Sequence, residues 1–282
     1  MDERLRGAVE RALGAKLGRT RRLAGGDISE AFLVELADGR RVFVKSLPSA
    51  APSMFLAEAR GLAWLAEARA LRVPEVLAVG SEVPFLALEY LEPGAPCAGF
   101  DEALGRGLAA LHRAGAPRFG LEHPNFIGRL AQDNTPEPDW PTFYRARRLA
   151  PLVRELDLAR RDRFERLFAR LPELVGPAER PARLHGDLWS GNLHRAPEGE
   201  PCLIDPAAYG GHREVDLAMM RLFGGFSERV FDAYAEAYPL AAGHAERVPL
   251  YQLYPLLVHV GLFGAGYLGS VDRALAALGA TR

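Results

Sequence analysis

The sequence predicts an α+β protein of two lobes, in which a small antiparallel β-sheet lobe with one helix precedes a larger, mostly α-helical lobe. Three observations support this fold class. Strand-like patterning dominates from Leu23 to Leu91, the segment from Pro93 to Pro96 interrupts it, and helical periodicity follows. Clusters of Pro and Gly mark boundaries because they fit turns better than helices or strands. We therefore place the two lobes at residues 1–92 and 93–282.

The first lobe contains a clear β-hairpin signal. Apolar runs at residues 31–36 and 41–47 flank Asp38-Gly39, a dipeptide that favours tight hairpin turns. Ser53 then has the residue type of an N-cap, for a helix that runs to about Ala68. Further strand-like runs occupy residues 73–79 and 84–90. We expect a small antiparallel sheet of five strands, of which these four runs are the clear ones.

The second lobe is helical by its hydrophobic periodicity. The expected helices cover residues 101–115, 142–157, 160–171, 214–222, 227–238 and 247–278. The exception is an extended patch at residues 183–204. It separates the helices into two groups and carries most of the polar motif residues described below.

The composition excludes several classes of protein. The 282 residues include 35 basic and 36 acidic side chains, for a net charge of −1, which argues against a nucleic-acid or membrane-surface partner. No apolar stretch is long enough to span a bilayer, and the first fourteen residues have a charged helical pattern instead of a signal peptide. Cys97 and Cys202 alone cannot form a disulfide framework. We expect a cytoplasmic enzyme or binding protein, most simply a monomer.

Lysine is rare in this chain and its positions are informative. Lys16 and Lys45 are the two lysines among 35 basic residues. The helix after Ser53 has an apolar face on which Glu58 projects between leucines, and a carboxylate there costs several kcal/mol unless it is paired. By itself, Glu58 fits a solvated position at the rim of that face. With Lys45 in the preceding strand as its partner, the pattern indicates a Lys–Glu clamp for phosphate.

A glycine pair precedes the hairpin. Gly25 and Gly26 are followed by Asp27 and Ser29. Adjacent glycines allow backbone N–H groups to approach an anion closely, and the Ser29 hydroxyl adds a donor. Such a pair is more often a simple turn, so this signal is weak without the others.

The strongest motif lies in the extended patch. His185-Gly186-Asp187 is followed by Asn192, and Asp205 ends an apolar strand nearby. Two carboxylates and an amide in one turn region are hard oxygen ligands that suit Mg²⁺. In phosphoryl transfer, one such Asp accepts the hydroxyl proton, and the Asn and the other Asp hold the metal. Each residue alone is an ordinary turn former, but the combination at this spacing favours chemistry.

These motifs, in this order, resemble the protein-kinase-like fold of small-molecule phosphotransferases, the group of aminoglycoside and choline kinases. The chain is more specifically similar to the fructosamine kinase, or ketosamine-3-kinase, family. The Trp-Ser-Gly core of the loop at residues 185–192 and the stretch at residues 204–219 carry that narrower resemblance. The resemblance spans nearly the whole chain and implies ATP and Mg²⁺ as cofactors.

The resemblance also implies a role for each motif residue. Asp187 corresponds to the catalytic base, Asn192 and Asp205 to the Mg²⁺ ligands, and Lys45 with Glu58 to the phosphate-binding ion pair. Lysine suits position 45 because its ammonium group is a compact point charge. The planar guanidinium group of Arg is a poor substitute for it. The nucleotide-binding residues would be completed by the glycine loop and by a hinge whose backbone binds adenine, namely Gly25, Gly26, Asp27, Ser29, Glu89, Tyr90 and Leu91.

The acceptor site is less sharply marked. Trp189, Tyr209, His212 and Arg213 are the candidates that shape it, because an aromatic face suits a sugar, although His212 is equally consistent with a plain hydrogen-bonding role. Asp216, close in sequence to them, is expected to be structural, either as the cap of the helix that follows or as a brace for the catalytic loop. The aromatic cluster Trp140, Phe143 and Tyr144 fits the core better than the cleft.

Departures from protein kinases argue against a polypeptide substrate. Gly186 stands where those enzymes have Arg, and Asp205-Pro206-Ala207 replaces Asp-Phe-Gly. The segment that leads to Asp216 is too short for a peptide-docking activation loop. The resemblance instead implies phosphorylation of the 3-hydroxyl of a ketosamine, free or protein-bound, in deglycation repair. It leaves open whether the sugar is a fructosamine, ribulosamine or erythrulosamine.

Three alternatives remain at this stage. An aminoglycoside or choline could be the acceptor, although no acidic run suggests a polycationic substrate. A catalytically inactive nucleotide-binding scaffold would keep the same residues. A metal-dependent hydrolase could use His185, Asp187, His194, Asp205 and His212, but it leaves Lys45, Glu58 and the glycine loop unexplained.

Overall fold

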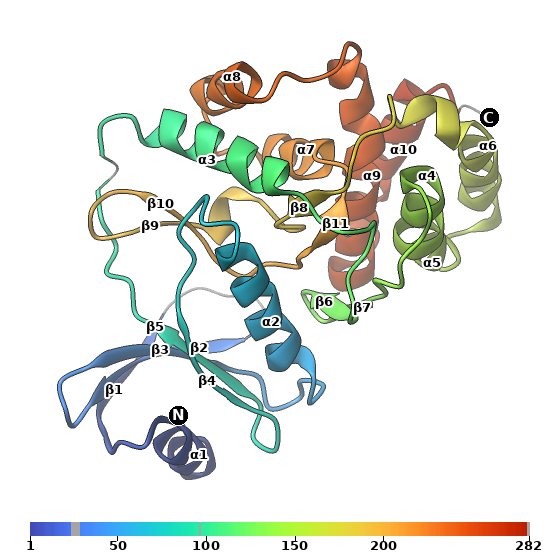
Figure 1. Ribbon diagram of the computed structural model, residues 1–282. Coiled ribbons are helices and arrows are strands. Elements are labelled where there is room, and N and C mark those ends of the chain that lie inside the picture. The colour runs from blue at the N-terminus through green and yellow to red at the C-terminus, as the bar shows by residue number, and fades with distance from the viewer. Residues whose placement is uncertain (24–28, 96, 281–282) are drawn as a thin grey trace.

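The computed structural model describes residues 1–23, 29–95 and 97–280, and Figure 1 shows a β-sheet lobe beside a larger helical lobe. The sheet has five strands in the order β1-β2-β3-β5-β4, and every neighbouring pair is antiparallel. The five strands are β1 (Leu17–Leu23), β2 (Glu30–Leu36), β3 (Arg41–Ser46), β4 (Val76–Gly80) and β5 (Phe85–Glu89). The predicted hairpin is confirmed, since β2 and β3 pair around a turn in which Gly39 has a φ of 88°.

The first strand begins earlier than the sequence pattern indicated. β1 starts at Leu17 and ends at Leu23, where strand-like patterning was expected to begin. It lies at the edge of the sheet and carries Arg19, Arg21 and Arg22, so it lacks an apolar alternation. Charged side chains on an edge strand discourage pairing with another sheet, which explains why this strand does not look like one in the sequence.

Helices cover both faces of the sheet. α1 (Glu3–Leu13) packs Leu5 and Val9 against one face, and α2 (Met54–Ala66) packs Phe55 and Leu62 against the other. Neighbouring residues of each strand point to opposite faces. In β3, Val44 therefore joins the core under α1, whereas the adjacent strand residues face α2. The charged N-terminal pattern is thus a second helix of this lobe, in addition to the one expected.

The start of α2 differs from the prediction in its chemistry. Ser53 occupies the N-cap position, but its backbone is already helical and its side chain makes no capping hydrogen bond. The helix is held instead by burial of its apolar face, which includes Phe55, Ala59, Leu62 and Leu65. Packing of this kind supplies most of the stability of helices in proteins, so a cap is dispensable here.

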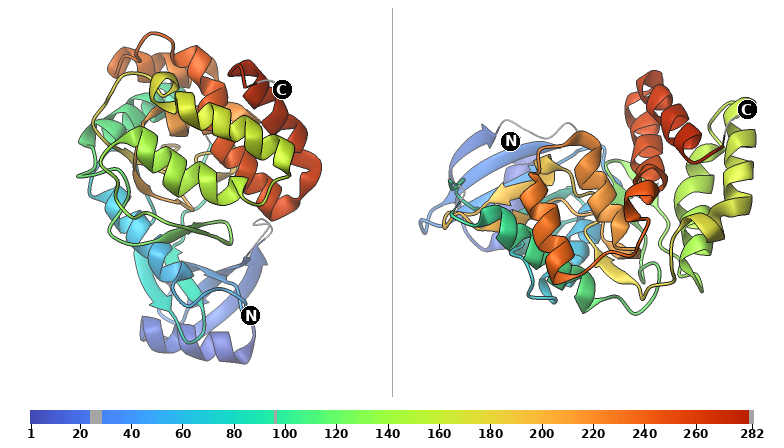
Figure 2. Two further views of the ribbon diagram at one scale, coloured as in Figure 1. Left: turned by 90° about the vertical axis from the view of Figure 1, so that its right-hand side faces the viewer. Right: turned by 90° about the horizontal axis from the view of Figure 1, so that it is seen from above.

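The helical lobe begins with α3, and its elements follow the predicted order. They are α3 (Phe100–Ala114), α4 (Trp140–Phe143), a π-helical turn (Tyr144–Leu149), α5 (Ala150–Val153), α6 (Leu158–Leu174), α7 (Glu214–Phe223), α8 (Glu228–Ala237), α9 (His244–Phe263), a 3₁₀ turn (Ala265–Tyr267) and α10 (Leu268–Ala277). The predicted lobe boundary at residues 92 and 93 falls between β5 and α3. Figure 2 shows the sheet lobe and the helical lobe from two further sides.

The long helix predicted for residues 247–278 is wrong, because the structure has two helices there. Gly264 follows α9 with a φ of 91°, a left-handed conformation that glycine adopts easily, and the chain reverses into α10. α10 then packs on both α9 and α6, and Phe164, Leu253 and Leu275 from these helices belong to the largest apolar core cluster. A smaller cluster joins α3 to α7 and α8. No helix in the described residues is long and apolar enough to cross a membrane.

Three small hairpins and pairs lie within the helical lobe and position its loops. β6 (Asn125–Ile127) pairs with β7 (Leu130–Gln132), β8 (Ala182–Leu184) with β11 (Tyr209–Gly211), and β9 (Leu193–Arg195) with β10 (Pro201–Leu203). β8 ends directly before His185, β9 begins directly after Asn192, and β10 ends two residues before Asp205. The strand ends therefore bring the two polar motifs of the sequence to the same place.

Candidate active site

The loop after β8 is built around Gly186 and Asp216. Gly186 has a φ of 83°, and a Cβ atom there would collide with the carbonyl oxygen of Ala207. The two carboxylate oxygens of Asp216 accept hydrogen bonds from the backbone N–H groups of His185, at 2.8 Å, and Gly186, at 2.9 Å. Asp216 lies in the first turn of α7, and its two hydrogen bonds hold the backbone of the loop in place. Its predicted structural role is confirmed.

His185 connects the two polar motifs. Its Nε2 lies 2.9 Å from the carbonyl oxygen of Ile204, to which it must donate, and its Nδ1 accepts from the N–H of Asp187 at 3.2 Å. Burial lowers the pKa of His185, which agrees with this neutral tautomer. The imidazole therefore fixes the backbone of Asp187 relative to the strand end that carries Asp205.

Asp187 and Asn192 are hydrogen-bonded to each other in the same loop. The side-chain nitrogen of Asn192 donates to the backbone oxygen of Asp187 at 2.8 Å and to its Oδ2 at 3.2 Å. Burial in the cleft raises the pKa of Asp187 to about 7, against the opposing effect of the Asn192 hydrogen bond. A carboxyl group whose pKa lies near neutrality suits general-base catalysis at that pH.

Lys45 joins the sheet lobe to this loop. Its Nζ lies 2.5 Å from Glu58 Oε1 on α2 and 2.8 Å from Asp205 Oδ1. Burial alone would lower the pKa of Lys45, but the two carboxylates outweigh it and raise the pKa. Burial raises the pKa of Glu58 to about 7, whereas Lys45 outweighs burial at Asp205 and holds the pKa of that carboxyl below its usual range.

The donor set fits a magnesium ion. Asn192 uses its nitrogen toward Asp187, which leaves its Oδ1 as an acceptor. Lys45 contacts Oδ1 of Asp205, and the side chain of Asp205 is half exposed to the cleft with a backbone φ of 53°. Carboxylate and amide oxygens are the ligands that Mg²⁺ prefers, and it takes few of them from protein when phosphates supply the rest. A positive φ at a non-glycine residue is typical of functional loops.

The residues of the hydrolase alternative are not brought together. Among the described residues, no group of three or more His, Cys, Asp or Glu side chains is placed to hold a metal ion. His212 stacks on Tyr251 in the core at 5.2 Å between ring centroids, and both ring nitrogens of His185 are used in hydrogen bonds to the backbone of Ile204 and Asp187. The arrangement thus separates the histidines that a dinuclear centre would need.

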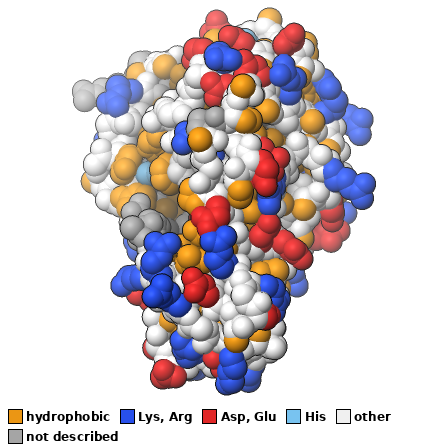
Figure 3. Space-filling model, turned by 90° about the vertical axis from the view of Figure 1, so that its left-hand side faces the viewer, with side chains coloured by type: hydrophobic (Ala, Val, Ile, Leu, Met, Phe, Trp, Pro, Cys, Tyr) orange, Lys and Arg blue, Asp and Glu red, His pale blue; other side chains and the backbone are white. Residues whose placement is uncertain are grey.

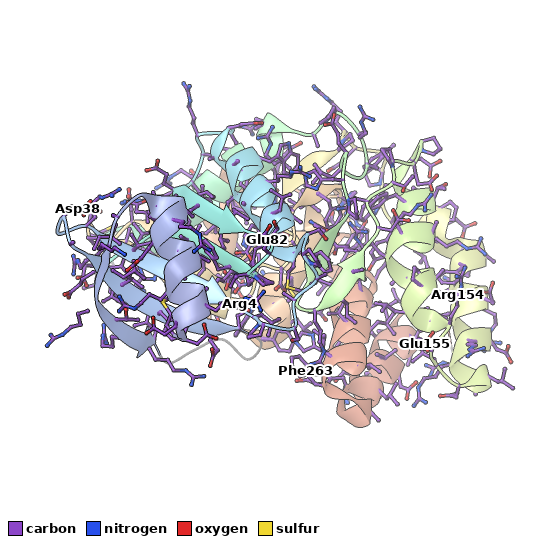
Figure 4. The ribbon with its side chains drawn as sticks, turned by 90° about the horizontal axis from the view of Figure 1, so that it is seen from below. Arg4, Asp38, Glu82, Arg154, Glu155 and Phe263 are labelled. Carbon is purple, nitrogen blue, oxygen red and sulfur yellow. The ribbon has the colours of Figure 1, made fainter. Side chains whose placement is uncertain are left out.

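A cavity of about 830 Å³ lies over these groups, between the two lobes. Ser29, Lys45, Glu58, Asp187 and Asn192 line it, together with Asp205 and Trp189. Other lining residues come from β6 and from the ends of α7 and α9, namely Asn125, Phe126, Ile127, Gly128, Phe223, Val258, His259, Leu262, Phe263 and Tyr267. In Figure 4, Phe263 lies at the end of α9 on the side that faces the sheet lobe.

Other predicted nucleotide-binding residues are placed differently. Gly25, Gly26 and Asp27 lie outside the described residues. Glu89, Tyr90 and Leu91 connect the lobes but do not line the cavity. The Glu89 carboxylate accepts from Arg72 at 2.7 Å, and Leu91 packs on Cys202. That the backbone of this segment binds adenine stays a prediction.

Three of the four residues predicted to shape the acceptor pocket are buried in the core. Tyr209 is 0% exposed beneath Arg148, and His212 is 3% exposed. Arg213, also 3% exposed, forms a bidentate ion pair with Glu179, with both N–O distances 2.8 Å. None of the three lines the cavity, so their assignment to the acceptor pocket is corrected to a packing role.

Trp189 is 39% exposed and lines the cavity, and its role in shaping the acceptor site stays a prediction. The expectation that Trp140, Phe143 and Tyr144 belong to the core is confirmed. Sequence reasoning missed the aromatic residues at the ends of α7 and α9, Phe223, His259, Phe263 and Tyr267. They are spread over 45 positions, and their only common signal is an aromatic ring next to a helix end.

The sequence profile of the fructosamine kinase family matches residues 1–280. The chain belongs to the fructosamine kinase family. It is 45% identical over 258 residues to a protein of Thermus thermophilus named probable ketoamine kinase, a match that covers 90% of this chain and 92% of the relative. It is 38% identical over 245 residues to the chloroplastic protein-ribulosamine 3-kinase of Arabidopsis thaliana, covering 83% of this chain and 74% of the relative.

Solved structures support the same assignment. The crystal structure of a Thermobifida fusca protein named as a fructosamine-3-kinase superposes on this chain with a TM-score of 0.89. The two sequences are 40% identical, and the match covers 97% of each chain. Choline kinase from Streptococcus pneumoniae shares the fold at 16% identity, with a TM-score of 0.66 and coverage of 99% of this chain and 100% of that one. This member of the fructosamine kinase family thus has the predicted protein-kinase-like fold and is an ATP-dependent phosphotransferase.

Proposed function

We propose that the protein transfers the γ-phosphoryl group of ATP to the 3-hydroxyl of a ketosamine. The observation that carries this proposal is the position of Lys45, which bridges Glu58 and Asp205 on the wall of the cavity that Asp187 and Asn192 also line. Phosphoryl transfer depends mainly on positioning and on charge stabilisation, and this arrangement supplies both.

Asp187 acts as the base. Its carboxylate accepts the proton of the sugar hydroxyl while that oxygen forms a bond to the γ-phosphorus and the bond to the ADP oxygen breaks. The Asn192 side chain holds Asp187 in place through two hydrogen bonds. The raised pKa of Asp187, about 7, makes the carboxylate a better proton acceptor than an exposed one.

Lys45 binds the phosphate chain of ATP. An ammonium group has three N–H donors. Lys45 donates one to Asp205 at 2.8 Å and forms an ion pair with Glu58. A donor is left for a phosphate oxygen at the cavity. Asn192 and Asp205 would hold Mg²⁺, which neutralises charge on the phosphates when it is bound.

The choice of acceptor rests on family membership and on the cavity wall. The names of the relatives point to ketoamines and, for the plant enzyme, to ribulosamines. Among the described residues that line the cavity, the carboxylates are Glu58, Asp187 and Asp205. All three already have proposed roles in binding phosphate or Mg²⁺ or in accepting the proton. A polycationic aminoglycoside would need acidic partners further out, so a ketosamine is the better fit. Phosphorylation next to its carbonyl group weakens the sugar–amine linkage, which would serve deglycation.

The experiment is a measurement of Mg²⁺-dependent ADP release with a panel of acceptors. The panel holds ribuloselysine, fructoselysine, an aminoglycoside, choline and a control without acceptor, and ³¹P NMR locates the phosphate on the product. We expect turnover with the ketosamines and a phosphate at the 3-position. Turnover with the aminoglycoside or choline alone would replace the acceptor but keep the reaction. ATP binding without turnover of any acceptor would favour a nucleotide-binding scaffold.

A further inference from the structure

Four aromatic side chains line one part of the cavity. Phe223 ends α7, His259 and Phe263 lie in the last turns of α9, and Tyr267 follows in the 3₁₀ turn. The centroid of the His259 ring lies 4.7 Å from that of Phe223, 5.4 Å from that of Phe263 and 4.9 Å from that of Tyr267. We call these four residues the aromatic pocket. His259 is at its centre.

The aromatic pocket is open, unlike the apolar core. Phe223 is 41% exposed and Phe263 is 50% exposed, although most large apolar side chains of the described chain are buried. Figure 3 shows hydrophobic side chains around a histidine on the face of the molecule that it presents. Exposed apolar rings cost free energy in water, and grouped together at a cavity they are typical of a ligand-binding surface.

The hydrogen bonds of His259 leave one ring nitrogen available. Its Nδ1 lies 2.7 Å from the carbonyl oxygen of Pro255, one turn earlier in α9. A carbonyl oxygen can only accept, so Nδ1 carries the hydrogen of the neutral ring. Nε2 is then an acceptor with a lone pair, and His259 lines the cavity. The pocket therefore offers the Nε2 acceptor of His259 and the hydroxyl of Tyr267 among aromatic rings.

The charge of the pocket limits what it can bind. The charged residues that line the described part of the cavity are Lys45, Glu58, Asp187 and Asp205, and none belongs to the aromatic pocket. Aromatic faces attract ammonium groups, and a histidine Nε2 lone pair accepts an N–H hydrogen bond. A singly charged organic ammonium thus finds complementary groups here without a fixed counter-charge at contact distance.

The pocket is next to the catalytic loop. A Cβ atom on Gly225, two residues after Phe223, would lie 2.6 Å from the side chain of Ser190. Gln252 in the middle of α9 donates to the backbone of Ala218 in the middle of α7 at 3.1 Å, which ties the two helices to each other. In a ketosamine, the amine nitrogen and the 3-hydroxyl are only a few bonds apart. Asp187 and His259 line the same cavity, so we place the 3-hydroxyl at Asp187 and the amine toward His259.

We propose that His259 Nε2 accepts a hydrogen bond from the protonated secondary amine of the ketosamine, and that the rings of Phe223, Phe263 and Tyr267 face its positive charge. His259 is then a specificity-determining residue that selects an amine-linked sugar over its ether analogue. This inference rests on the proposed ketosamine kinase function.

The test compares two acceptors that differ in one atom. One is a ketosamine, and the other is the same ketose with an ether oxygen in place of the amine nitrogen. Values of kcat/KM are measured for both with the native enzyme and with His259→Phe, which keeps a ring but removes the acceptor. His259→Gln restores an acceptor. His244→Phe is the matched control, because it makes the same change in an exposed residue at the opposite end of α9.

We expect the native enzyme to prefer the amine by roughly tenfold to a hundredfold, the range for a hydrogen bond to a charged group. His259→Phe should abolish most of that preference by lowering kcat/KM for the amine alone. His259→Gln should retain part of it, and His244→Phe should retain all of it. A merely structural role of His259 would lower kcat/KM for both acceptors equally.

Two results separate failure of this inference from failure of the proposed function. In the first result, the native enzyme phosphorylates ketosamines, but it has no preference for the amine over the ether, or the His259→Phe variant keeps the native preference. His259 then does not recognise the amine, and the kinase function stands. If the native enzyme phosphorylates neither acceptor, the proposed function fails and the inference fails with it.

Discussion

Lys45 Nζ lies 2.8 Å from Asp205 Oδ1, although the two residues are 160 positions apart in the chain. Lys45 belongs to the sheet lobe and Asp205 to the helical lobe, so this ion pair couples the lobes at the point where ATP is proposed to bind. Glu58 completes the contact from α2. A change in the shape of the cation at position 45 should therefore alter the geometry of both lobes at the cavity.

Lys45→Arg should lower kcat/KM for ATP by about a hundredfold or more, the cost of losing one well-placed donor in a transition state. The guanidinium keeps the charge, but its planar fork cannot point separate donors at Glu58, Asp205 and a phosphate. The measurement is steady-state ADP release at varied ATP concentration.

Lys16→Arg is the matched control for Lys45→Arg. Lys16 is the other lysine of the chain, it is 83% exposed, and it pairs with Glu10 at 2.9 Å. We expect native activity from this variant. If Lys45→Arg is as active as Lys16→Arg, catalysis does not depend on a lysine that contacts Glu58, Asp205 and the proposed phosphate together.

Asp187→Asn should separate chemistry from nucleotide binding. The amide cannot accept the hydroxyl proton, and we expect kcat to fall by roughly a factor of a thousand, within the range for general-base catalysis. Lys45, Glu58 and Asp205 are unchanged, so the Kd for ATP, measured by isothermal titration calorimetry, should stay within about threefold of the native value.

Asp162→Asn controls for the substitution itself, since Asp162 is exposed on α6 and far along the chain from the site. It should match the native enzyme in both kcat and Kd. Turnover by Asp187→Asn at the rate of this control would remove Asp187 from the role of base.

Gly186→Ala should destabilise the protein and reduce kcat. A Cβ at this position collides with the carbonyl oxygen of Ala207, and the φ of 83° is itself unfavourable for alanine. Gly14→Ala is the control, because Gly14 has a φ of 64° but open space around the added atom. We expect the control to cost about 1–2 kcal/mol of unfolding free energy and Gly186→Ala to cost about 1–3 kcal/mol more.

Urea unfolding and kcat measure the two effects of Gly186→Ala. The collision pushes the chain between His185 and Asp187 away from Asp216, so the loss of kcat should exceed that of Gly14→Ala. Equal losses of stability in the two variants would show that the loop relaxes freely, contrary to the tight contact with Ala207.

His212 should make the folded state sensitive to acid. Burial lowers its pKa to about 4 from 6.5, despite Glu179 nearby, because the ring lies in the core next to Arg213 and Arg247. The unfolded chain therefore binds a proton between pH 6.5 and 4 that the folded protein does not. The contribution of His212 to stability is full above pH 6.5 and falls as the pH decreases, by about 1.4 kcal/mol per pH unit.

His212→Gln should flatten the dependence of unfolding free energy on pH between 4 and 6.5, as measured by urea titrations at several pH values. His244→Gln alters an exposed histidine and should keep the native slope. A native slope in His212→Gln would mean that other groups, such as the buried His185, account for the acid sensitivity.

Local sequence information was sufficient for most elements. The Asp38-Gly39 hairpin, α2 and the loop from His185 to Asn192 depend on turn chemistry and short-range periodicity, and the structure has each of them close to its predicted place. The pairing of Lys45 with Glu58 could also be inferred, because a carboxylate on an apolar helix face needs a partner and lysine is rare in this chain. Asp205 as a second partner of Lys45 was not foreseen, since it depends on how the lobes meet.

The sequence by itself determined the order of strands and helices, the family resemblance and the polar groups of phosphoryl transfer, because these depend on residue types at short spacing. The tertiary structure decided which side chains face the cavity. It buried Tyr209, His212 and Arg213 inside the helical lobe, and it brought Phe223 to His259 by packing α7 on α9. Burial and ring contacts of this kind arise when helices that are distant in the chain pack together. Local periodicity in the sequence does not show which helices will do so.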